Sequence, residues 1–254
     1  KAALAPGVLL IGLYVGYILF ISARNPAIAP AIPPSDAPKF IQVKNALLAI
    51  IPPLTLIFVV LGSIFAGIAT PTESSALGGI GALVLALTYG QFQLKMIWES
   101  AKETVMVSAM VFAILLGATA FSMTFSYSGG DMLLEEWLLQ LPGEKWGFLI
   151  LTMLVVLILG FFIDFVEITF IIIPVLAPIA ETLGISMVWF AILIAMNLQT
   201  SFLTPPFGFS LFYLKGVTPA SIRTSDIYRG VLPFIGIQIS VLAILLMKPE
   251  WFGF

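Results

Sequence analysis

The chain has 254 residues, of which 60% are hydrophobic and 9% are charged, and its net charge is −2. Soluble domains average about 25% charged residues, so this composition, with a mean hydropathy of +1.13, predicts a polytopic helical membrane protein. The sequence contains no cysteine and no histidine, which excludes disulfides, thiolate metal sites and histidine proton relays. It has no basic tract, so nucleic-acid binding is not expected.

Four candidate spans occupy the first half of the chain. They cover residues 6–21, 45–65, 73–89 and 104–125, close to the ~18–20 residues that cross a bilayer. A polar, proline-rich loop over 22–44 follows the first span. Residues 92–103, with Trp98 among them, alternate apolar and charged residues at helical spacing, which predicts an amphipathic helix at the interface. Because basic residues gather on the side that holds the 22–44 loop, that side is expected to be cytoplasmic.

The segment Thr70-Pro71-Thr72-Glu73 precedes the third span. Thr70 can be the N-cap, Pro71 the first helical residue and Glu73 the reciprocal partner of the cap, which is a capping box. In the functional alternative, the polar groups of Thr70, Thr72 and Glu73 face a partner or the substrate path.

A short helix is expected at 131–141, and two apolar stretches, 146–162 and 165–181, follow it with no soluble loop between them. They are either two full spans joined by a tight turn or a re-entrant hairpin whose tip stops inside the membrane. Pro174 and Pro178 interrupt the second stretch and favour the hairpin. Asp164 lies between the stretches. A carboxylate at the centre of a membrane helix costs about 2.5–3.5 kcal/mol, so it should face a cavity, a cation or a partner unless it is a turn residue at the surface.

The next span, 185–216, contains a break, and a last span covers 228–247. Pro205 and Pro206 remove two backbone donors, so the helix should end near 203 and restart near 207. The free carbonyls of the first half, together with the Thr204 hydroxyl, are hard oxygen ligands suited to sodium, and the free N–H groups of the second half suit an anion. The alternative is a plain proline kink. Polar residues near the break favour a site: Asn197, Gln199, Thr200, Ser201 and Thr204.

Several of these segments together resemble the large membrane subunit of tripartite ATP-independent periplasmic (TRAP) transporters. The resemblance lies in the order and spacing of Gly67-Ile-Ala-Thr-Pro-Thr-Glu73, Gly160-Phe-Phe-Ile-Asp164, Ile173-Pro174 with Pro178, Gly184-Ile185, and Leu203-Thr-Pro-Pro-Phe-Gly208. It covers only the second of the family's two inverted repeats. The first repeat is therefore expected on a separate chain or in a segment that this sequence lacks.

The resemblance implies a sodium-driven elevator in the bacterial inner membrane. Backbone carbonyls at Gly160, Ser201, Thr204 and Phe207 would hold Na⁺ with help from the Thr204 side chain, although family members often carry glycine at the position of Ser201. The transport path would include Asp164, Thr200, Pro205, Pro206, Thr70, Thr72 and Glu73. The implied partners are a small four-helix membrane subunit, a periplasmic substrate-binding protein, and an organic anion such as a C4-dicarboxylate or a sialic acid.

The same resemblance divides the chain by role. Residues 1–130 would be largely scaffold, 131–145 a periplasmic interfacial helix, 146–218 the transport-domain hairpin and broken helix, and 219–254 the last span. Two rival functions stay open, a stand-alone ion-coupled anion transporter of the same superfamily and a non-transporting scaffold subunit. The sequence shows no nucleophile–base pair or metal cluster, so enzymatic activity is not expected.

Overall fold

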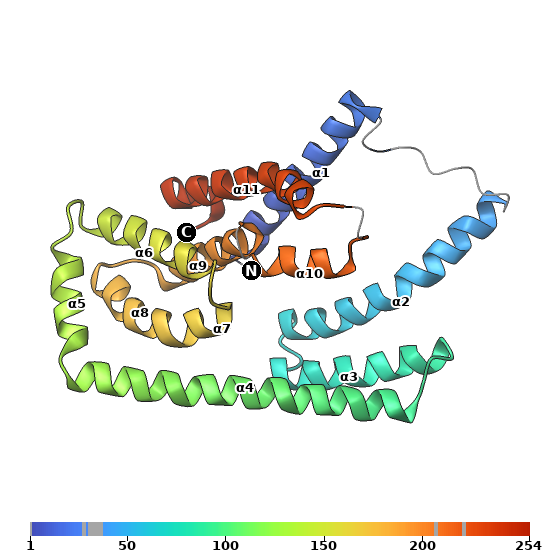
Figure 1. The fold of residues 1–254 in the computed structure, drawn as a ribbon, viewed down its shortest axis with the longest axis horizontal. Helices are drawn as coiled ribbons and strands as arrows, with labels where there is room; N and C mark the ends of the chain where they lie inside the picture. The colour runs from blue at the N-terminus through green and yellow to red at the C-terminus, as the bar shows by residue number, and fades with distance from the viewer. Residues whose placement is uncertain (1, 27–28, 30–37, 206–207, 220–221) are drawn as a thin grey trace. The chain divides into compact units, whose positions relative to one another are not determined.

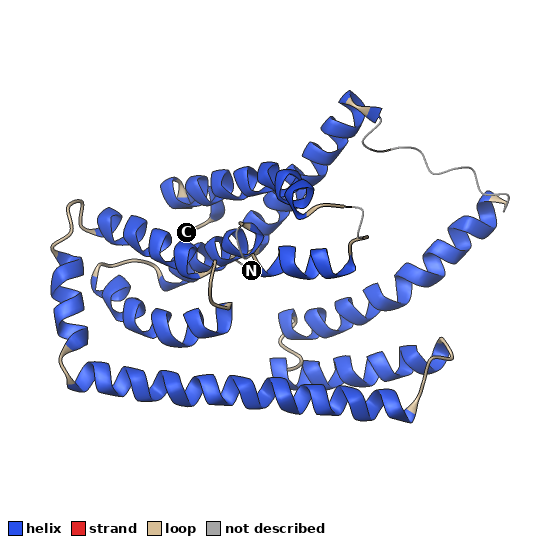
Figure 2. Cartoon of the chain, in the orientation of Figure 1, coloured by secondary structure: helices blue, strands red, loops and turns tan. Residues whose placement is uncertain are grey.

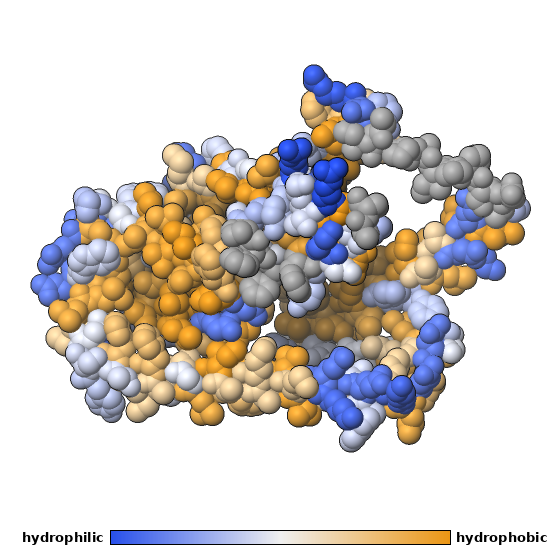
Figure 3. Space-filling view, in the orientation of Figure 1, coloured by the Kyte–Doolittle hydropathy of each residue, from blue (hydrophilic) through white to orange (hydrophobic). Residues whose placement is uncertain are grey.

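The computed structural model describes residues 2–26, 29, 38–205, 208–219 and 222–254. Within these ranges every regular element is a helix (Figure 2). Among the described residues, five helices are long and apolar enough to cross a membrane: Leu4–Arg24, Phe40–Phe65, Leu94–Tyr127, Phe165–Thr182 and Thr224–Met247. Apolar side chains are widely exposed (Figure 3), as lipid-facing helices require. The prediction of an all-α, polytopic membrane protein is confirmed.

The helices group into two units, one made of Lys1–Ala29 with Ala109–Phe254 and the other of Pro30–Ser108. The elements follow the colour sequence of Figure 1: α1 (Leu4–Arg24), α2 (Lys39–Phe65), α3 (Pro71–Thr88), α4 (Leu94–Tyr127), α5 (Gly130–Leu139), α6 (Lys145–Leu159), α7 (Phe165–Glu167), the π-helix η2 (Ile168–Ile172), α8 (Ile173–Thr182), α9 (Met187–Leu203), α10 (Phe209–Val217), α11 (Thr224–Met247) and the 3₁₀ helix η3 (Pro249–Phe252). The division into scaffold and transport segments concerns movement during transport and stays a prediction.

In the unit of residues 30–108, α2 and α3 pack through small residues. The hydroxyl oxygens of Ser63 and Ser74 lie 2.8 Å apart, and Ser74 is fully buried. A Cβ added to Gly81 would overlap the Leu56 side chain, so the absence of a side chain there lets the helices approach closely. Small residues at helical spacing allow the same close packing between membrane helices in general.

The start of α3 is the predicted capping box. Thr70 Oγ1 accepts a hydrogen bond from the Glu73 N–H at 3.3 Å, and Glu73 Oε2 accepts one from the Thr70 N–H at 2.8 Å. Pro71 occupies the first helical position, where its missing N–H is not needed. The structural reading of this segment is confirmed.

Two consecutive prolines, Pro52 and Pro53, lie inside α2. A proline deprives the carbonyl four residues earlier of its helical donor, and for Pro52 that carbonyl belongs to Leu48. The hydroxyl of Tyr89, the residue that ends α3, donates a hydrogen bond to the Leu48 carbonyl at 3.2 Å. The second helix of the pair therefore supplies the donor that the proline removes.

The long helix α4 differs from the prediction. The expected interfacial helix at 92–103 and the expected span at 104–125 form one uninterrupted helix of 34 residues, Leu94–Tyr127. At 1.5 Å per residue its length is about 51 Å, well beyond a hydrocarbon core of about 30 Å. Its first turns keep an amphipathic character, with an ion pair of 3.6 Å between Lys95 and Glu99 and with Lys102 over the Trp98 ring. The residues remain helix-forming through the change from amphipathic to apolar composition, so the expected boundary between residues 103 and 104 is wrong.

In the larger unit, α9 is the central helix. On one side it packs against α6 and on another against α11, to which Trp189 Nε1 donates a buried hydrogen bond at the Leu245 carbonyl, 3.0 Å away. The side chains at this centre are almost fully enclosed: Phe148, Leu149, Val156, Phe190, Leu193, Val241 and Leu245. The first helix, α1, joins this unit through Tyr14 and Tyr17, whose rings meet Phe234 edge-on.

Candidate functional site

The helical hairpin consists of α6, a tip at residues 160–164, and a second arm made of α7, η2 and α8. At the tip, the N–H groups of Phe162 and Ile163 both donate to the Leu159 carbonyl, at 2.9 and 3.0 Å, which closes the end of α6. The first arm has 15 residues and the second has 18. These lengths correspond to about 22 and 27 Å, against a hydrocarbon thickness of about 30 Å. The second arm is just long enough to cross a membrane, but the first arm is shorter than a span, which favours the hairpin over two full spans.

Asp164 begins the second arm. Its Oδ1 accepts a hydrogen bond from the Phe165 N–H at 2.7 Å, and its backbone is extended, as is usual for a helix N-cap. The side chain is only partly buried. The structure thus gives Asp164 a local structural role at the hairpin tip, and its role in the transport path stays a prediction.

Helices α6 and α9 lie side by side and run in the same direction. Three contacts define their register: the rings of Phe148 and Phe190 stack with centroids 6.0 Å apart, Asn197 Nδ2 donates to the Met153 carbonyl at 2.6 Å, and Gly160 meets Ser201. Residue numbers rise together along both helices, so the helices are parallel. The hairpin tip consequently lies level with the end of α9, where the chain breaks.

Gly160 and Ser201 form a close contact between the hairpin tip and the broken helix. A Cβ on Gly160 would overlap Ser201 Oγ and would lie 2.8 Å from Ser201 Cβ, closer than side chains pack. Ser201 itself is fully buried. The serine at position 201 is therefore compatible with close backbone approach, because Gly160 provides the room.

The end of α9 concentrates oxygen atoms. Thr204 has left the helical conformation, and its hydroxyl donates to the Thr200 carbonyl at 2.7 Å, while Ser201 Oγ donates to the Leu198 carbonyl at 2.8 Å. These bonds use the hydroxyl hydrogens and leave oxygen lone pairs available. After the break, a Cβ on Gly208 would lie 2.8 Å from the Phe202 carbonyl oxygen and 3.0 Å from the Thr204 carbonyl oxygen. The end of α9 and the chain before α10 thus fold closely onto each other.

The predicted site residues fall into three groups. The structure brings Gly160 against Ser201, with Thr200, Thr204 and Pro205 on the adjoining turn and Asp164 in the same hairpin tip. Pro206 and Phe207 lie outside the described residues. The remaining three, Thr70, Thr72 and Glu73, belong to the unit of residues 30–108, where Thr70 and Glu73 form the capping box.

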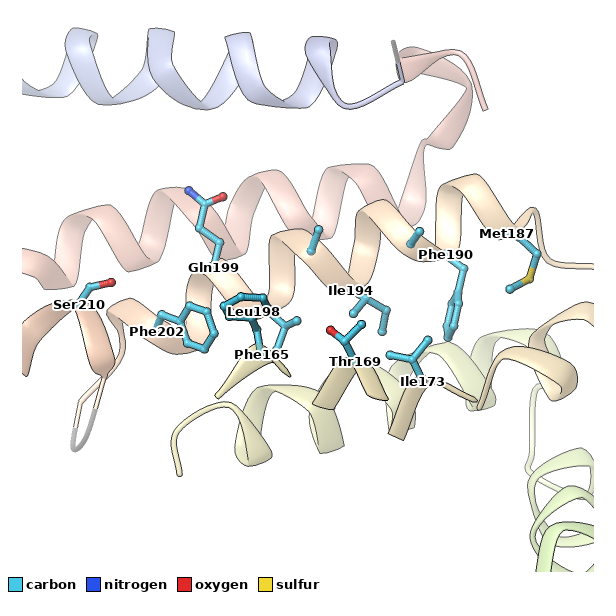
Figure 4. A pocket seen from close by; sticks show the side chains of 12 residues that line it. Phe165, Thr169, Ile173, Met187, Phe190, Ile194, Leu198, Gln199, Phe202 and Ser210 are labelled. Carbon is cyan, nitrogen blue, oxygen red and sulfur yellow. The ribbon is translucent and has the colours of Figure 1, made fainter. Parts of the chain in front are cut away.

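A groove of about 490 Å³ lies between the second arm of the hairpin and α9 (Figure 4). Phe165 and Phe202 meet at one end with their ring centroids 6.2 Å apart, and Thr169 faces Ile194 farther along. Among the described lining residues, the polar side chains are those of Thr169, Gln199 and Ser210. An apolar groove with so few polar groups suits a hydrophobic surface better than a carboxylate.

The donors near the tip indicate what kind of ion fits. Among the described residues there is no cluster of three or more histidine, cysteine, aspartate or glutamate side chains. The hydroxyls of Ser201 and Thr204 and the backbone carbonyls they bond lie in the last turns of α9, and the Asp164 carboxylate lies in the hairpin tip. Hard neutral oxygens suit an alkali-metal cation rather than a transition metal.

Asn197 was expected only as one of the polar side chains near the break. The structure shows its amide buried between α6 and α9 and bonded to the Met153 carbonyl. The available signal was the asparagine itself, since polar side chains inside membrane helices are rare and usually make specific contacts.

Residues 1–251 match the family model of the tripartite ATP-independent periplasmic transporter, DctM component. The chain belongs to this family. It is 31% identical over 214 residues to the sialic acid TRAP transporter large permease protein SiaM of Vibrio cholerae, an alignment that covers 84% of this chain and 49% of that protein.

The C4-dicarboxylate TRAP transporter large permease proteins DctM show similar relationships. The protein of Rhodobacter capsulatus is 31% identical over 77% of this chain and 44% of its own length. The protein of Pseudomonas aeruginosa is 29% identical over 99% of this chain and 59% of its own length. This chain of the DctM family thus spans about half the length of these relatives, which are named as transport permeases and not as enzymes. The resemblance seen in the sequence is confirmed.

Proposed function

We propose that this DctM-family chain carries the coupling-ion site of a TRAP transporter large permease and supports sodium-driven import of an organic anion. The observation that carries the proposal is the contact between Gly160 in the hairpin tip and Ser201 in the last turns of α9. Two interrupted helices that meet within the apolar part of a transporter are the usual construction of an ion and substrate site.

In the proposed site, sodium is a co-transported substrate held by neutral oxygens. The carbonyls at Gly160, Ser201, Thr204 and Phe207, with the Thr204 hydroxyl, supply hard ligands at the negative end of the α9 dipole. Because the Thr204 hydroxyl hydrogen already points to the Thr200 carbonyl, its oxygen is free to accept a cation. Bound charge would offset the mutual repulsion of these carbonyl oxygens and tie the hairpin tip to α9.

The substrate is proposed to be an organic anion, and the site for it would lie near the beginning of α10. Free N–H groups at a helix start favour a carboxylate. Relatives of this chain are named for sialic acid and for C4-dicarboxylates, which both carry carboxylates. Asp164, Thr200, Pro205 and Pro206, with Thr70, Thr72 and Glu73, are proposed to border the path that the anion follows.

The whole transporter is proposed to need more than this chain. The missing first-repeat (N-terminal) half of the permease, a small four-helix membrane subunit and a periplasmic substrate-binding protein would complete it in the bacterial inner membrane. Within it, the hairpin and broken helix at 146–218 would move as an elevator against a scaffold that includes most of residues 1–130.

The test is a thermal-stability titration of the purified transporter complex in detergent, with sodium exchanged for potassium at constant ionic strength. A ligand that binds only the folded state stabilises it by about 2.7 kcal/mol at a hundredfold excess over Kd. We expect a sodium-specific rise in Tm that Thr204→Ala removes while its Tm in potassium changes little. Equal Tm values in sodium and potassium for the unmodified complex would contradict sodium coupling and favour a scaffold role.

A further inference from the structure

Asn197 is a buried amide with one satisfied and one unsatisfied end. It lies within α9 and is 1% exposed. Its Nδ2 donates to the Met153 carbonyl of α6 at 2.6 Å, and its Oδ1 is buried without a hydrogen-bond partner in the structure. Among the described residues, this is the side-chain hydrogen bond that joins α6 to α9.

Packing alone does not account for an asparagine at this position. One helical turn from this bond on each helix lie the fully enclosed apolar side chains of Val156 and Leu193. Leaving an acceptor such as Oδ1 buried and unpaired destabilises the folded state, whereas an apolar side chain of similar size would not. What asparagine provides at this position, and leucine would not, is the hydrogen bond to the Met153 carbonyl of α6.

That hydrogen bond restrains sliding of α6 past α9 along their axes. Asn197 lies one turn before Ser201 in α9, and Met153 lies two turns before Gly160 in α6. Helix α6 is continuous up to the tip, where the Gly160 N–H still donates to the Val156 carbonyl at 2.9 Å. Apolar contacts such as the Phe148–Phe190 stack tolerate a small slide of one helix past the other, but a directional hydrogen bond does not.

We propose that Asn197 is a positioning residue that fixes the axial register of hairpin arm α6 against α9. By holding Met153 in place, it keeps Gly160 beside Ser201 and so presents the tip carbonyls for ion binding. The inference rests on the proposed function, because it assigns to Asn197 a part in the affinity of the sodium site. Asn197 itself is not proposed as a ligand.

The decisive variant is Asn197→Leu, studied in the complete transporter complex. Leucine removes the hydrogen bond and the unpaired oxygen together, so we expect Tm in potassium to stay the same or rise. We expect the half-saturating sodium concentration in the Tm titration to rise about tenfold, the usual effect of losing one buried hydrogen bond. Asn197→Gln, which retains the donor, should keep more of the sodium response. Asn197→Ala serves the same purpose if leucine prevents folding.

A second readout reports the tip directly. The sequence has no cysteine, so a single cysteine at Phe162, which is 61% exposed in the tip, can be labelled selectively on this chain with a maleimide. In the Phe162→Cys background we expect sodium to slow labelling severalfold relative to potassium. With Asn197→Leu added, labelling in potassium should be faster than with Asn197, and sodium should protect only at about tenfold higher concentration.

The matched control is Trp189→Phe. It removes another buried hydrogen bond from the same helix, the one from Trp189 Nε1 to the Leu245 carbonyl, but that bond joins α9 to α11. We expect it to lower Tm equally in sodium and potassium and to leave the half-saturating sodium concentration unchanged.

The outcomes separate the two proposals. If the unmodified complex responds to sodium and Asn197→Leu shows the same half-saturation and the same labelling rate, the positioning role is wrong while the proposed function stands. If Trp189→Phe weakens sodium binding as much as Asn197→Leu, the effect is general destabilisation and the positioning role is again wrong. If the unmodified complex does not respond to sodium, the proposed function fails and this inference fails with it.

Discussion

Gly160 lies so close to Ser201 that a single added methyl group would overlap the serine hydroxyl. This contact joins the end of α6 to the last turns of α9, two segments about forty residues apart in sequence. Adding one carbon atom, the Cβ of an alanine at position 160, would therefore push the hairpin tip and the broken helix apart.

We expect Gly160→Ala to reduce stability by about 1–3 kcal/mol, the usual effect of overpacking, and to abolish the sodium-dependent part of Tm. Ser201→Gly removes the atoms with which the new methyl group would collide. The double variant Gly160→Ala/Ser201→Gly should therefore recover much of the stability and of the sodium response. Non-additivity in a double-mutant cycle measured by thermal unfolding would verify the contact, whereas additive losses would contradict it.

Two substitutions at Asp164 can separate its helix-capping role from the role of its negative charge in transport. Asparagine can also accept a hydrogen bond from the Phe165 N–H, so Asp164→Asn should change the free energy of unfolding by less than about 0.5 kcal/mol. Asp164→Leu should lower it by about 1 kcal/mol, because the helix cap disappears. Uptake of radiolabelled substrate into proteoliposomes measures whether the negative charge of Asp164 contributes to transport. We expect Asp164→Asn to lower uptake severalfold if the carboxylate borders the path, and unchanged uptake would restrict Asp164 to capping.

The hydrogen bond from Tyr89 to Leu48 gives a prediction within the unit of residues 30–108. Tyr89→Phe should destabilise the protein by about 0.5–1.5 kcal/mol because the Leu48 carbonyl loses its donor. In a Pro52→Ala background the helix itself supplies an N–H to that carbonyl, so Tyr89→Phe should have little further effect. Equal losses in the two backgrounds, measured by thermal unfolding in detergent, would show that Tyr89 does not compensate for the proline.

The α2–α3 contact provides a matched pair of glycines. A Cβ at Gly81 would overlap Leu56, whereas at Gly79 it would meet no atom within 4 Å. We expect Gly81→Leu to separate the helices and lower Tm by several degrees, and Gly79→Leu to leave Tm within about two degrees of the unmodified protein. If both substitutions are equally harmful, the described α2–α3 packing is not the one present in the membrane.

Local features of the fold followed from local sequence signals. The capping box at Thr70 and Glu73 and the end of α9 before Pro205 depend on neighbouring residues, and the structure has both where the sequence predicted them. The arms of the hairpin were also predicted to within a few residues, because Asp164 interrupts an apolar run.

Relationships across the chain did not follow from sequence. The parallel register of α6 and α9 depends on which faces pack, and the Asn197–Met153 bond is visible only once that register is known. The continuity of α4 was missed for a different reason. A change from amphipathic to apolar composition alters what surrounds a helix without ending it, since the backbone hydrogen bonds do not depend on the solvent facing the side chains.

The equal level of the hairpin tip and the end of α9 has an electrical consequence. The first arm of the hairpin is shorter than a membrane span, so a cation bound at the tip would lie within the transmembrane field. Moving one charge through the whole potential is worth about 2.3 kcal/mol per 100 mV, and an ion that reaches an intermediate depth experiences part of this energy. Occupancy of the proposed site should therefore depend on membrane voltage as well as on sodium concentration, and transport should be faster in energised vesicles.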